Sequence, residues 1–469
     1  MKLEKNPIDL TVVGGGLAGL AGGLRAAELG KRVLILEQGA DPRYPCNTRY
    51  SGGVFHIAYN NPHGPAHTLL EIIISATRGE VDRVIAQSIA NNSARTLDWL
   101  KKNGTKFIRG PLSWQRFITA PPRPLKAGLD WPGYGPDLLV RNLTQKFKVA
   151  GGIIALGHKA IELICSNGKC KGLIARDRNG KTHAILSENV LLADGGFQNN
   201  PELLRRYITP NPELLIQRSA GTAYGDGIRM AEAAGAQLSD MRRFYGHLLS
   251  RDGLENPDLT PYPQLDQISS AAIVVDGEGS RFLNEGLGGI YIANKIARFE
   301  NPTLAFTIFD RTIWNEGPGV KSIYPANPTV EIAGGTVFRA ENITILAENI
   351  GAIPSTLKTS VENYNSIIRS GNRENSSLSK LDGTGLATAI ETPPFMAIPI
   401  AVGITATMGG ILVGANMQVR NKNGGLIPGL FGAGGTTGGL EGGGTLGYIG
   451  GLIKAATMGL LAGEAVSQT

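Results

Sequence analysis

The stretch DLTVVGGGLAGLAGGLRAAELGKRVLILEQ, residues 9–38, decides the fold. Its apolar run Leu10–Val13 is long enough for one buried strand, and a helical stretch follows that Gly30 ends. Three glycines stand between strand and helix in GxGxxG spacing: Gly14, Gly16 and Gly19. A second apolar strand, Val33–Leu36, ends at Glu37. The pattern predicts a strand–turn–helix–strand unit.

Each part of this unit has a mechanical role in binding a dinucleotide. One glycine permits the tight turn, one lets the backbone approach the pyrophosphate, and one lets helix and strand pack closely. The helix N-terminus offers free N–H groups and a partial positive charge to the phosphates. Glu37 stands where a carboxylate accepts the ribose hydroxyls. In a chain with 64 glycines, a structural glycine-rich turn is the alternative, but the parts occur in register. FAD and NAD both use this unit, so it leaves the choice between them open.

Composition bounds the remaining possibilities. The chain has 469 residues, 42% of them hydrophobic and 18% charged, which predicts a globular protein of two or three domains. A net charge of +7 without a Lys/Arg run gives nucleic-acid binding little support. Three cysteines without metal-ligand spacing are expected to be reduced thiols. The glycine-rich strand begins too early for a signal peptide, and Lys454 interrupts the apolar C-terminal helix, so we expect a cytoplasmic protein without a membrane span.

A polar loop at 42–58 follows the ribose-binding acid and is expected to run along the cofactor. Asn47, Thr48 and Ser51 can contact the cofactor there, and Gly52–Gly53 allows close approach. Tyr50 and its neighbour Arg49 either point at a ligand or lie on the surface. Helical periodicity follows over 68–103, and the Pro-, Gly- and Trp-rich segment 111–137 predicts a long loop of the kind that is often functional.

The next segments predict alternating helix and strand. They are a helix at Leu138–Val149, a strand at Gly152–Leu156, a meander at 160–165, 171–176 and 182–185, and a strand at Asn189–Ala193 that runs into Asp194-Gly195-Gly196. Gly225-Asp226-Gly227 then opens an amphipathic helix. Asp226 is either its N-cap or an acceptor for the ribityl hydroxyls of a flavin, and taken alone the residue favours the cap.

From Arg243 onward the composition changes to that of a separate α+β unit, followed by a polar linker at 371–385. An apolar β pattern resumes at 393–413, and 428–466 predicts a strand, a glycine-dense loop and a helix whose N-terminus can face an anionic group. We therefore expect an α/β fold: a Rossmann-like cofactor domain built from both chain ends, 1–243 and 392–469, with a capping domain at 244–391 inserted between them.

An ordered set of motifs resembles one family. VVGGGLAGLAGGLRAAELGKRVLILEQG, NTRYSGG, LLADGGF, GDGIRMAEAAGA, GSRFLNE, TATMGG and PGLFGAGGTTGG occur between residues 11 and 439. In these the chain is similar to the FAD-binding flavoproteins that include fumarate reductase, succinate dehydrogenase, 3-ketosteroid dehydrogenases and tricarballylate dehydrogenase. The resemblance implies FAD rather than NAD, and it favours a cofactor role for Asp226. The NTRYSGG segment lacks the histidine to which some relatives attach flavin, which implies non-covalent FAD, although His56 keeps a covalent link open.

The cofactor contacts that the motifs and the resemblance together imply form one set. It consists of Gly14, Gly16, Leu17, Ala18, Gly19, Glu37, Gln38, Asn47, Thr48, Ser51, Gly52, Gly53, Ala160, Ala193, Asp194, Gly195, Asp226, Gly434, Gly435, Thr445 and Leu446.

The resemblance carries over less well to the substrate. Thr405 and Ala406 stand where the fumarate-reducing branch has a histidine pair, and Gly444 and Thr445 stand where it has Asn-Arg. Both lost pairs bind substrate carboxylates in that branch, so fumarate and succinate are disfavoured. The proton-donating arginine of that branch has no exact counterpart: Arg311 directly follows Asp310, and Trp314 is nearer the expected place. Retained are a substrate-contacting histidine, His247, and the relay glutamate of FLNE, Glu285.

The family reaction exchanges a hydride between flavin N5 and the carbon β to a carbonyl or carboxylate, while a proton moves at the α carbon. The candidate acids and bases are His247, Tyr245, Tyr291 and Arg311, and for the histidine and the two tyrosines a purely structural role is the alternative. Tyr50, Thr405 and Thr445 are the candidate substrate contacts, the two threonines as partners of a carbonyl.

The expected substrate therefore has at most one carboxylate and is a cyclic or unsaturated ketone or acid. Two alternatives stay open: oxidation of a C–N or C–O bond, and a catalytically retired flavin-binding protein. The sequence has no CxxCH and no iron–sulfur cysteine pattern. Electrons are therefore expected to leave to an unidentified acceptor, such as a partner protein, a quinone or oxygen.

Overall fold

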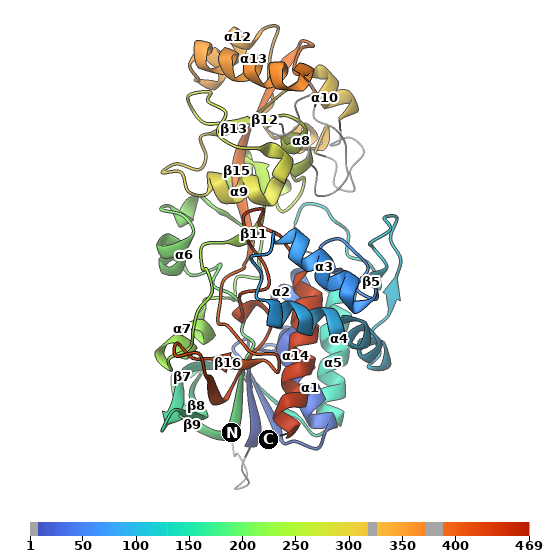
Figure 1. The fold of residues 1–469 in the computed structure, drawn as a ribbon, viewed down its shortest axis with the longest axis vertical. Helices are drawn as coiled ribbons and strands as arrows, with labels where there is room; N and C mark the ends of the chain where they lie inside the picture. The colour runs from blue at the N-terminus through green and yellow to red at the C-terminus, as the bar shows by residue number, and fades with distance from the viewer. Residues whose placement is uncertain (1–7, 129, 318–325, 371–387, 469) are drawn as a thin grey trace.

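The computed structural model describes residues 8–128, 130–317, 326–370 and 388–468. Two layers are stacked along the long axis, each with its own hydrophobic core (Figure 1). We call the lower layer, built on the sheet that contains the N-terminal strand, the lower domain, and the upper layer the cap. The predicted linker at 371–385 lies outside the described residues.

The lower domain is organised around a mostly parallel sheet. Its strands are, in spatial order, β16 (Gln418–Arg420), β17 (Leu426–Gly432), β9 (Thr182–Leu192), β1 (Ile8–Val13), β2 (Val33–Glu37) and β6 (Ile153–Leu156). Only β16 pairs antiparallel in this row. The two strands predicted around the glycine turn are confirmed, and their fully apolar runs are buried on both faces, as a parallel sheet requires. Strand β17 comes from the far end of the sequence, so both chain ends build this sheet.

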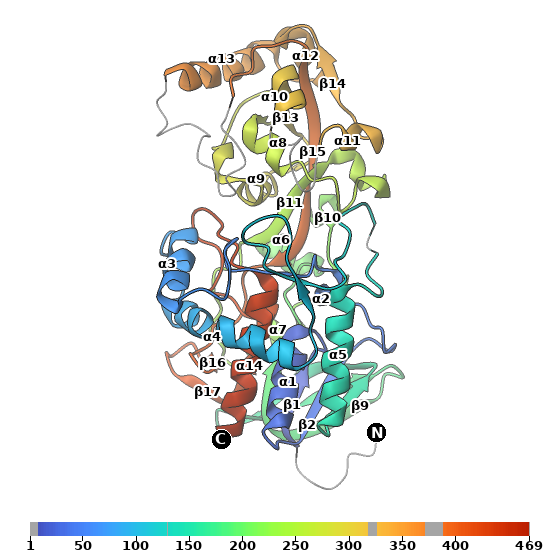
Figure 2. The same ribbon diagram turned by 90° about the vertical axis from the view of Figure 1, so that its right-hand side faces the viewer.

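Three helices lie side by side against this sheet: α1 (Leu17–Glu28), α5 (Gly135–Val149) and α14 (Gly451–Gln468) (Figure 2). Glycines let α1 and α14 touch backbone to backbone. A Cβ added at Gly459 would lie 2.3 Å from the Ala18 carbonyl oxygen, and one at Gly22 would lie 3.1 Å from the Gly459 carbonyl oxygen. None of the described helices is both long and apolar enough to cross a lipid bilayer.

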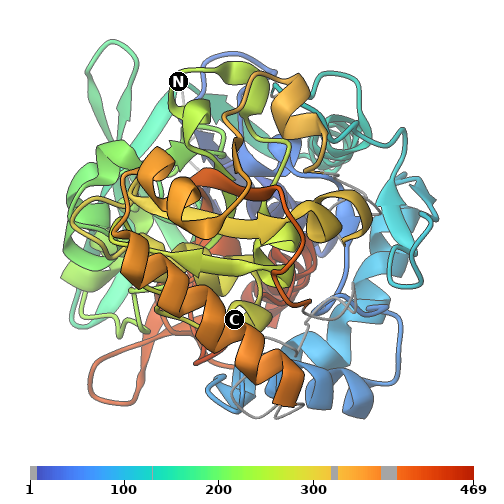
Figure 3. The ribbon, with the colours of Figure 1, turned by 90° about the horizontal axis from the view of Figure 1, so that it is seen from above.

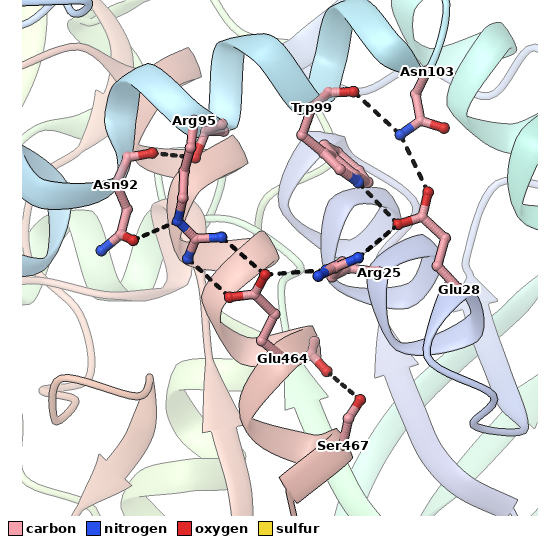
Figure 4. A network of polar contacts seen from close by, with 10 residues as sticks. Arg25, Glu28, Asn92, Arg95, Trp99, Asn103, Glu464 and Ser467 are labelled. Atoms are coloured by element: carbon pink, nitrogen blue, oxygen red, sulfur yellow. Dashed lines mark hydrogen bonds and ion pairs between the residues drawn. The ribbon is translucent and has the colours of Figure 1, made fainter.

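The helical stretch predicted at 68–103 is two helices, α3 (Ala66–Ala76) and α4 (Arg83–Lys102). Gly79 adopts a positive φ between them, and the Asp82 side chain then caps α4 by accepting hydrogen bonds from two backbone N–H groups. A polar network ties α4 to α1 and α14 (Figure 4). In it, Glu464 accepts hydrogen bonds from Arg25 and Arg95 at 2.8–3.1 Å.

The predicted meander is formed by β7 (His158–Ser166), β8 (Lys169–Asp177) and β9. Its third strand and the strand predicted at 189–193 are one continuous element. Strand β9 begins antiparallel to β8 and, from Ser187 onward, pairs parallel with β1. No glycine or proline separates the two halves, so the strand continues from one sheet into the other.

The cap is a second sheet with helices above it. In spatial order its strands are β10 (Ile216–Gln217), β15 (Phe395–Thr407), β13 (Ala305–Asp310) and β12 (Ile273–Val275), and β11 (Phe244–Ser250) and β14 (Phe338–Ala340) also pair with β15. The helices are α8 (Asp266–Ala271), α9 (Gly289–Ile296), α10 (Arg311–Glu316), α11 (Thr329–Ile332), α12 (Ile343–Ile350) and α13 (Pro354–Ser370). Seen from above, α13 lies across the cap strands (Figure 3).

The domain to which strand β15 belongs differs from the division expected from the sequence. The predicted return to the cofactor domain at residue 392 precedes β15, but this strand bonds to four cap strands and its side chains lie in the cap core. The sheet pairing places the return after Thr407. The outgoing and returning chains touch there, since the Met408 N–H donates to the Arg243 carbonyl at 2.9 Å.

The remaining elements are short. They are α2 (Asn47–Tyr50), β3 (Val54–Phe55), β4 (Phe107–Ile108), β5 (Phe117–Thr119), α6 (Pro201–Tyr207), α7 (Asp226–Ala233) and 3-10 turns at Pro212–Leu214, Arg251–Leu254, Pro257–Leu259, Glu285–Leu287 and Gly434–Thr436.

Candidate active site

A cavity of about 650 Å³ runs from the glycine turn after β1 up to the cap strands β11 and β15. Its lower wall contains the GxGxxG turn, Glu37 and the start of α14, and its upper wall contains Tyr245, His247 and Thr405. The cavity therefore joins the predicted cofactor residues to the predicted substrate residues.

The three motif glycines differ in the space that surrounds them. Gly14 has a φ of +99°, and a Cβ there would lie 2.7 Å from the Ala193 carbonyl oxygen. At Gly19 a Cβ would lie 2.0 Å from the Gly14 carbonyl oxygen, so this residue permits the close packing of helix on strand. At Gly16 the nearest atom would be the Thr48 hydroxyl at 3.8 Å, so this position faces open space in the cavity. A phosphate group fits such a cradle at the N-terminus of α1.

Glu37 is held at the end of β2 by backbone donors. One carboxylate oxygen accepts a hydrogen bond from Gly15 N at 2.9 Å and the other from Gly39 N at 2.7 Å. Burial raises the pKa of the Glu37 carboxyl, and these two N–H groups oppose the rise. Glu37 lines the cavity beside the turn, where its carboxylate can accept hydrogen bonds from a ribose diol.

Two further carboxylates line the middle of the cavity. Asp194 accepts hydrogen bonds from Gly227 N at 2.8 Å and from the Thr436 hydroxyl at 3.2 Å, and burial raises its pKa to about 6. Asp226 caps nothing: the N-cap of α7 is Gly225, and the Asp226 side chain pairs with Lys159 at 2.8 Å and with Arg229 at 2.5 Å. Its carboxylate is therefore directed to the cavity rim, where hydroxyl groups of a bound cofactor can reach it.

Most of the predicted cofactor set meets in this cavity. The lining residues among it are Gly14, Gly16, Leu17, Ala18, Glu37, Gln38, Asn47, Thr48, Ser51, Gly52, Gly53, Ala160, Ala193, Asp194, Gly195, Asp226 and Gly435. Four members lie outside the lining: Gly19, Gly434, Thr445 and Leu446. Gly434 packs against Ala18, and the Thr445 hydroxyl donates to the Ala76 carbonyl at 2.9 Å. The donors and the open glycine cradle thus fit a flavin dinucleotide.

Tyr245 and His247 form a hydrogen-bonded chain in the upper wall. The Tyr245 hydroxyl lies 3.0 Å from His247 Nε2, and His247 Nδ1 lies 3.1 Å from an oxygen of Asp266 on α8. A carboxylate only accepts, so Nδ1 carries the proton and Nε2 accepts from the tyrosine. Burial lowers the pKa of His247, and the charge of Asp266 opposes this. The arrangement is a phenol with a neutral base behind it.

Aromatic side chains complete the upper cavity. The Tyr245 ring stacks on Tyr448 with centroids 3.7 Å apart, and the Tyr448 hydroxyl accepts a hydrogen bond from Gly451 N at the start of α14. His56 stacks on Tyr59 at 4.9 Å and meets Trp114 edge-on. Burial lowers the pKa of His56 to about 4, so this ring is neutral at pH 7. The space between these rings suits a flat, apolar molecule.

Tyr50 and Thr405 also line the cavity, whereas three other predicted residues lie elsewhere. Tyr291 is on α9 beneath the Lys295 ammonium, Arg311 is exposed at the start of α10, and Thr445 is bonded to α3 as described. Glu285 is fully buried in a 2.6 Å ion pair with Arg281 and does not line the cavity. Asp310, the residue before Arg311, caps α10 with its carboxylate, and neither residue lines the cavity.

Several residues that line the cavity belong to none of the sequence motifs: Gln198, Arg123, Arg218, Tyr262, Asp266 and Tyr448. Arg123 lies in the Pro-, Gly- and Trp-rich loop that composition marks as functional, so its segment was within reach of prediction. Arg218 follows a two-residue strand and gives no signal in the sequence. Asp266 is 19 residues from His247 in the chain, and only the fold brings the two side chains together.

Comparisons with known proteins agree with this geometry. A family described as "FAD binding domain" matches residues 9–449. NADH:acrylate oxidoreductase of Vibrio harveyi is 26% identical over 99% of this chain, and the chain spans about half (51%) of that protein's length. Fumarate reductase (cytochrome) of Shewanella frigidimarina is 25% identical over 97% of this chain and 76% of its own.

A solved structure of similar fold is the 3-ketosteroid-Δ4-(5α)-dehydrogenase of Rhodococcus jostii RHA1, in complex with 4-androstene-3,17-dione. It matches with a TM-score of 0.73 at 21% identity and covers 100% of this chain and 99% of its own. At this identity the likeness establishes a shared fold.

Proposed function

Because the chain belongs to the FAD-binding domain family, we propose that it exchanges a hydride across a carbon–carbon bond next to a carbonyl or carboxylate. The predicted family, the α/β fold and the FAD cofactor are confirmed by the match over residues 9–449 and by the shared fold. The chain is an FAD-dependent oxidoreductase. Acrylate, fumarate and 3-ketosteroids, named for the relatives, each contain such an activated bond, which supports the predicted CH–CH class.

One observation carries the proposal: Tyr245, His247 and Asp266 form a proton chain in the same cavity as the cofactor cradle. When bound, FAD supplies hydride exchange at its N5. In desaturation, the Tyr245 oxygen takes the α proton while its own proton passes to His247 Nε2, and Asp266 stabilises the imidazolium. In reduction the same proton returns through Tyr245 to the α carbon. The Tyr448 ring holds the Tyr245 ring in place by stacking.

We propose a substrate with at most one carboxylate, an unsaturated or cyclic ketone or acid. Thr405 and Ala406 line the cavity where the fumarate-reducing branch is expected to have carboxylate-binding histidines, and Gly444 and Thr445 lie outside the cavity lining. Arginine and histidine are thus absent from both positions. The Thr405 position has one guanidinium beside it, that of Arg218, whereas a carboxylate placed at Gly444 or Thr445 would have no charged side chain at that position, at a cost of several kcal/mol.

The experiment is flavin reoxidation. The purified holoenzyme is reduced without oxygen and mixed with acrylate, cinnamate, 2-cyclohexenone or fumarate, and the flavin absorbance is followed. We expect one of the first three to reoxidise the flavin at least tenfold faster than fumarate, because about 1.4 kcal/mol of poorer binding is a factor of ten. Fumarate as the fastest oxidant would contradict the proposed substrate, and the absence of reoxidation by every alkene would contradict the proposed reaction.

We also propose that FAD is held non-covalently. His56 Nδ1 accepts a hydrogen bond from Tyr59 N at 3.2 Å, and the ring is stacked and neutral, which favours a packing role. Acid precipitation should therefore release the yellow colour into the supernatant. Colour retained in the pellet of the native protein but released from His56→Ala would instead identify a covalent link at this residue.

A further inference from the structure

One corner of the upper cavity contains a buried cation without a carboxylate partner. Arg218 directly follows β10 and is 8% exposed. Its two terminal nitrogens donate to the Thr405 hydroxyl at 2.8 Å and to the Pro261 carbonyl at 3.3 Å, and the guanidinium also bonds to Tyr262. Within the part of the chain that the structure describes, all these partners are neutral. A buried guanidinium in such surroundings favours an anion as its missing partner.

Unsatisfied polar atoms mark the same corner. Arg218 Nε is buried without a hydrogen-bond partner, and so are both amide atoms of Gln198, a side chain with no exposed surface. Gln198 directly follows Phe197, whose N–H donates to the Thr407 hydroxyl, so both residues lie against the same end of β15. Both line the cavity. Buried polar atoms in native proteins are nearly always paired, so a bound ligand is expected to complete them.

A second guanidinium makes the corner more positive. Arg123 lines the cavity and donates to the backbone carbonyls of Tyr50 at 2.6 Å and Asp130 at 2.8 Å. Burial lowers the pKa of Arg123, with the charge of Arg218 among the lesser causes. The Tyr262 phenol lies under the influence of both guanidinium groups. The Asp130 charge acts on Arg123, and Asp266, which also lines the cavity, is hydrogen-bonded to His247.

The corner lies one residue along β15 from the proton chain. Arg218 holds Thr405, and Tyr245 is paired with Ala406 in the register of β11 on β15. Neighbouring residues of a strand are separated by about 3.3 Å along its axis. The Arg218 side chain lies on the same face of β15 as His247, because a Cβ added at Gly403, the register partner of His247, would lie 2.4 Å from Arg218 Cδ. His247 bonds to Tyr245, so a group bound by Arg218 is close enough to Tyr245 for the two to act on adjacent parts of one small molecule.

We infer that Arg218, with the Gln198 amide beside it, binds the single carboxylate of the substrate and places its α carbon at Tyr245. This inference rests on the proposed function and sharpens it, because it selects an unsaturated monocarboxylic acid over a neutral ketone. The guanidinium takes the place of the histidine and arginine pairs missing from the sequence, and it comes from the residue that follows β10. The stacked rings of Tyr245 and Tyr448 and the indole of Trp114 leave room for a flat hydrocarbon body on the acid.

The test compares two acids with their neutral amides. Cinnamate, cinnamamide, acrylate and acrylamide are titrated into oxidised holoenzyme, and binding is read from the change in the flavin absorption spectrum. The variants are Arg218→Gln, Gln198→Leu and, as a matched control, Arg251→Gln. Arg251 likewise donates to a backbone carbonyl, that of Thr303, but lies in the cap outside the cavity lining.

We expect at least one acid to bind tighter than its amide, and Arg218→Gln to weaken that acid about 30-fold or more while changing its amide less than about threefold. Gln198→Leu should weaken the acid about tenfold. The control should leave every affinity unchanged. Equal losses for acid and amide in Arg218→Gln, or amides that bind the wild-type protein as tightly as both acids, would overturn the inference.

Failure of the inference and failure of the proposed function give different results. If 2-cyclohexenone reoxidises the reduced flavin of wild type and Arg218→Gln equally well, and the acids bind no better than their amides, the reaction stands and the carboxylate site is wrong. If an acid binds through Arg218 but no alkene reoxidises the flavin, the site stands and the reaction is wrong.

Discussion

Gly16 and Gly19 differ in the space that is available for a methyl group in place of the glycine hydrogen. At Gly16 a methyl would extend into the cavity with no protein atom closer than 3.8 Å, whereas at Gly19 it would meet backbone at 2.0 Å. Gly16→Ala should therefore fold with a stability change within about 0.5 kcal/mol and lose FAD affinity. Gly19→Ala should instead destabilise the protein by about 3 kcal/mol.

Denaturant titration of both apoproteins, followed by FAD titration monitored by fluorescence, separates these effects. Tight FAD binding by Gly16→Ala would show that the pyrophosphate does not approach this residue.

Tyr245 can be tested without disturbing its stack. Tyr245→Phe keeps the ring against Tyr448 and removes the hydroxyl that bonds to His247. Loss of a general acid or base typically slows turnover by 10²–10⁴-fold, and we expect about this loss in kcat with substrate affinity preserved. Pre-steady-state reoxidation measures it. An unchanged rate would remove Tyr245 from the proton path.

The pH profile of desaturation tests the residue behind Tyr245. His247 must be neutral to accept a proton, so activity should rise with pH through the pKa of His247 and stay level above it. Burial lowers that pKa below its ordinary value of 6.5, and the Asp266 charge limits the decrease. Asp266→Asn should therefore move the acid limb of kcat/KM to lower pH. An acid limb above pH 6.5 that Asp266→Asn does not shift would show that another group titrates.

At the scale of elements, three helices of the lower domain are joined through Glu464 (Figure 4). Burial raises the pKa of this carboxyl, but the hydrogen bonds and charges of Arg95 and Arg25 outweigh it and hold the pKa below 4.5. A depressed pKa contributes stability above the unfolded-state value and loses it as pH falls.

We expect Glu464→Gln to cost about 1 kcal/mol or less at pH 7, because the pair is partly exposed, and less at pH 3, because the stabilisation is lost as the pH falls toward the lowered pKa. Thermal melts at both pH values measure this, and Glu362→Gln, in an exposed pair on α13, is the control. A difference that grows in acid would contradict the ion-pair account.

Prediction from sequence worked best where one element carries its own signal. The apolar strands, the glycine turn and the acid at Glu37 are local patterns, and the structure brings them together as expected. Arg218 and Asp266 could not be found this way, because their partners Thr405 and His247 are distant in the chain and meet only through the cap sheet. Strand β15 was predicted as a strand, but its apolar pattern carries no information about which sheet it joins.

At the scale of the whole molecule, the lower domain and the cap have separate cores, and the cavity lies between them. FAD in the glycine cradle contacts the lower domain, whereas an acid at Arg218 and Tyr245 reaches the cap strands as well. We expect FAD at a hundredfold excess over Kd to raise the free energy of unfolding of the lower domain by up to about 2.7 kcal/mol, and its unfolding midpoint with it. A bound acid should then couple the unfolding of both layers. Differential scanning calorimetry measures this. Equal shifts of every transition with FAD alone would contradict it.

The position of β15 also limits how this protein could be recombined with its relatives. If the cap were exchanged as the contiguous segment 244–391, β11, β13 and β14 would be separated from β15, the strand with which all three pair. Crossovers placed at the touching pair Arg243 and Met408 would instead transfer β11, β13 and β14 together with β15 and the Tyr245–His247 part of the substrate wall. Strand β10 and the adjoining Arg218 precede that crossover, so a chimaera that exchanges substrate preference should also exchange the segment that contains them.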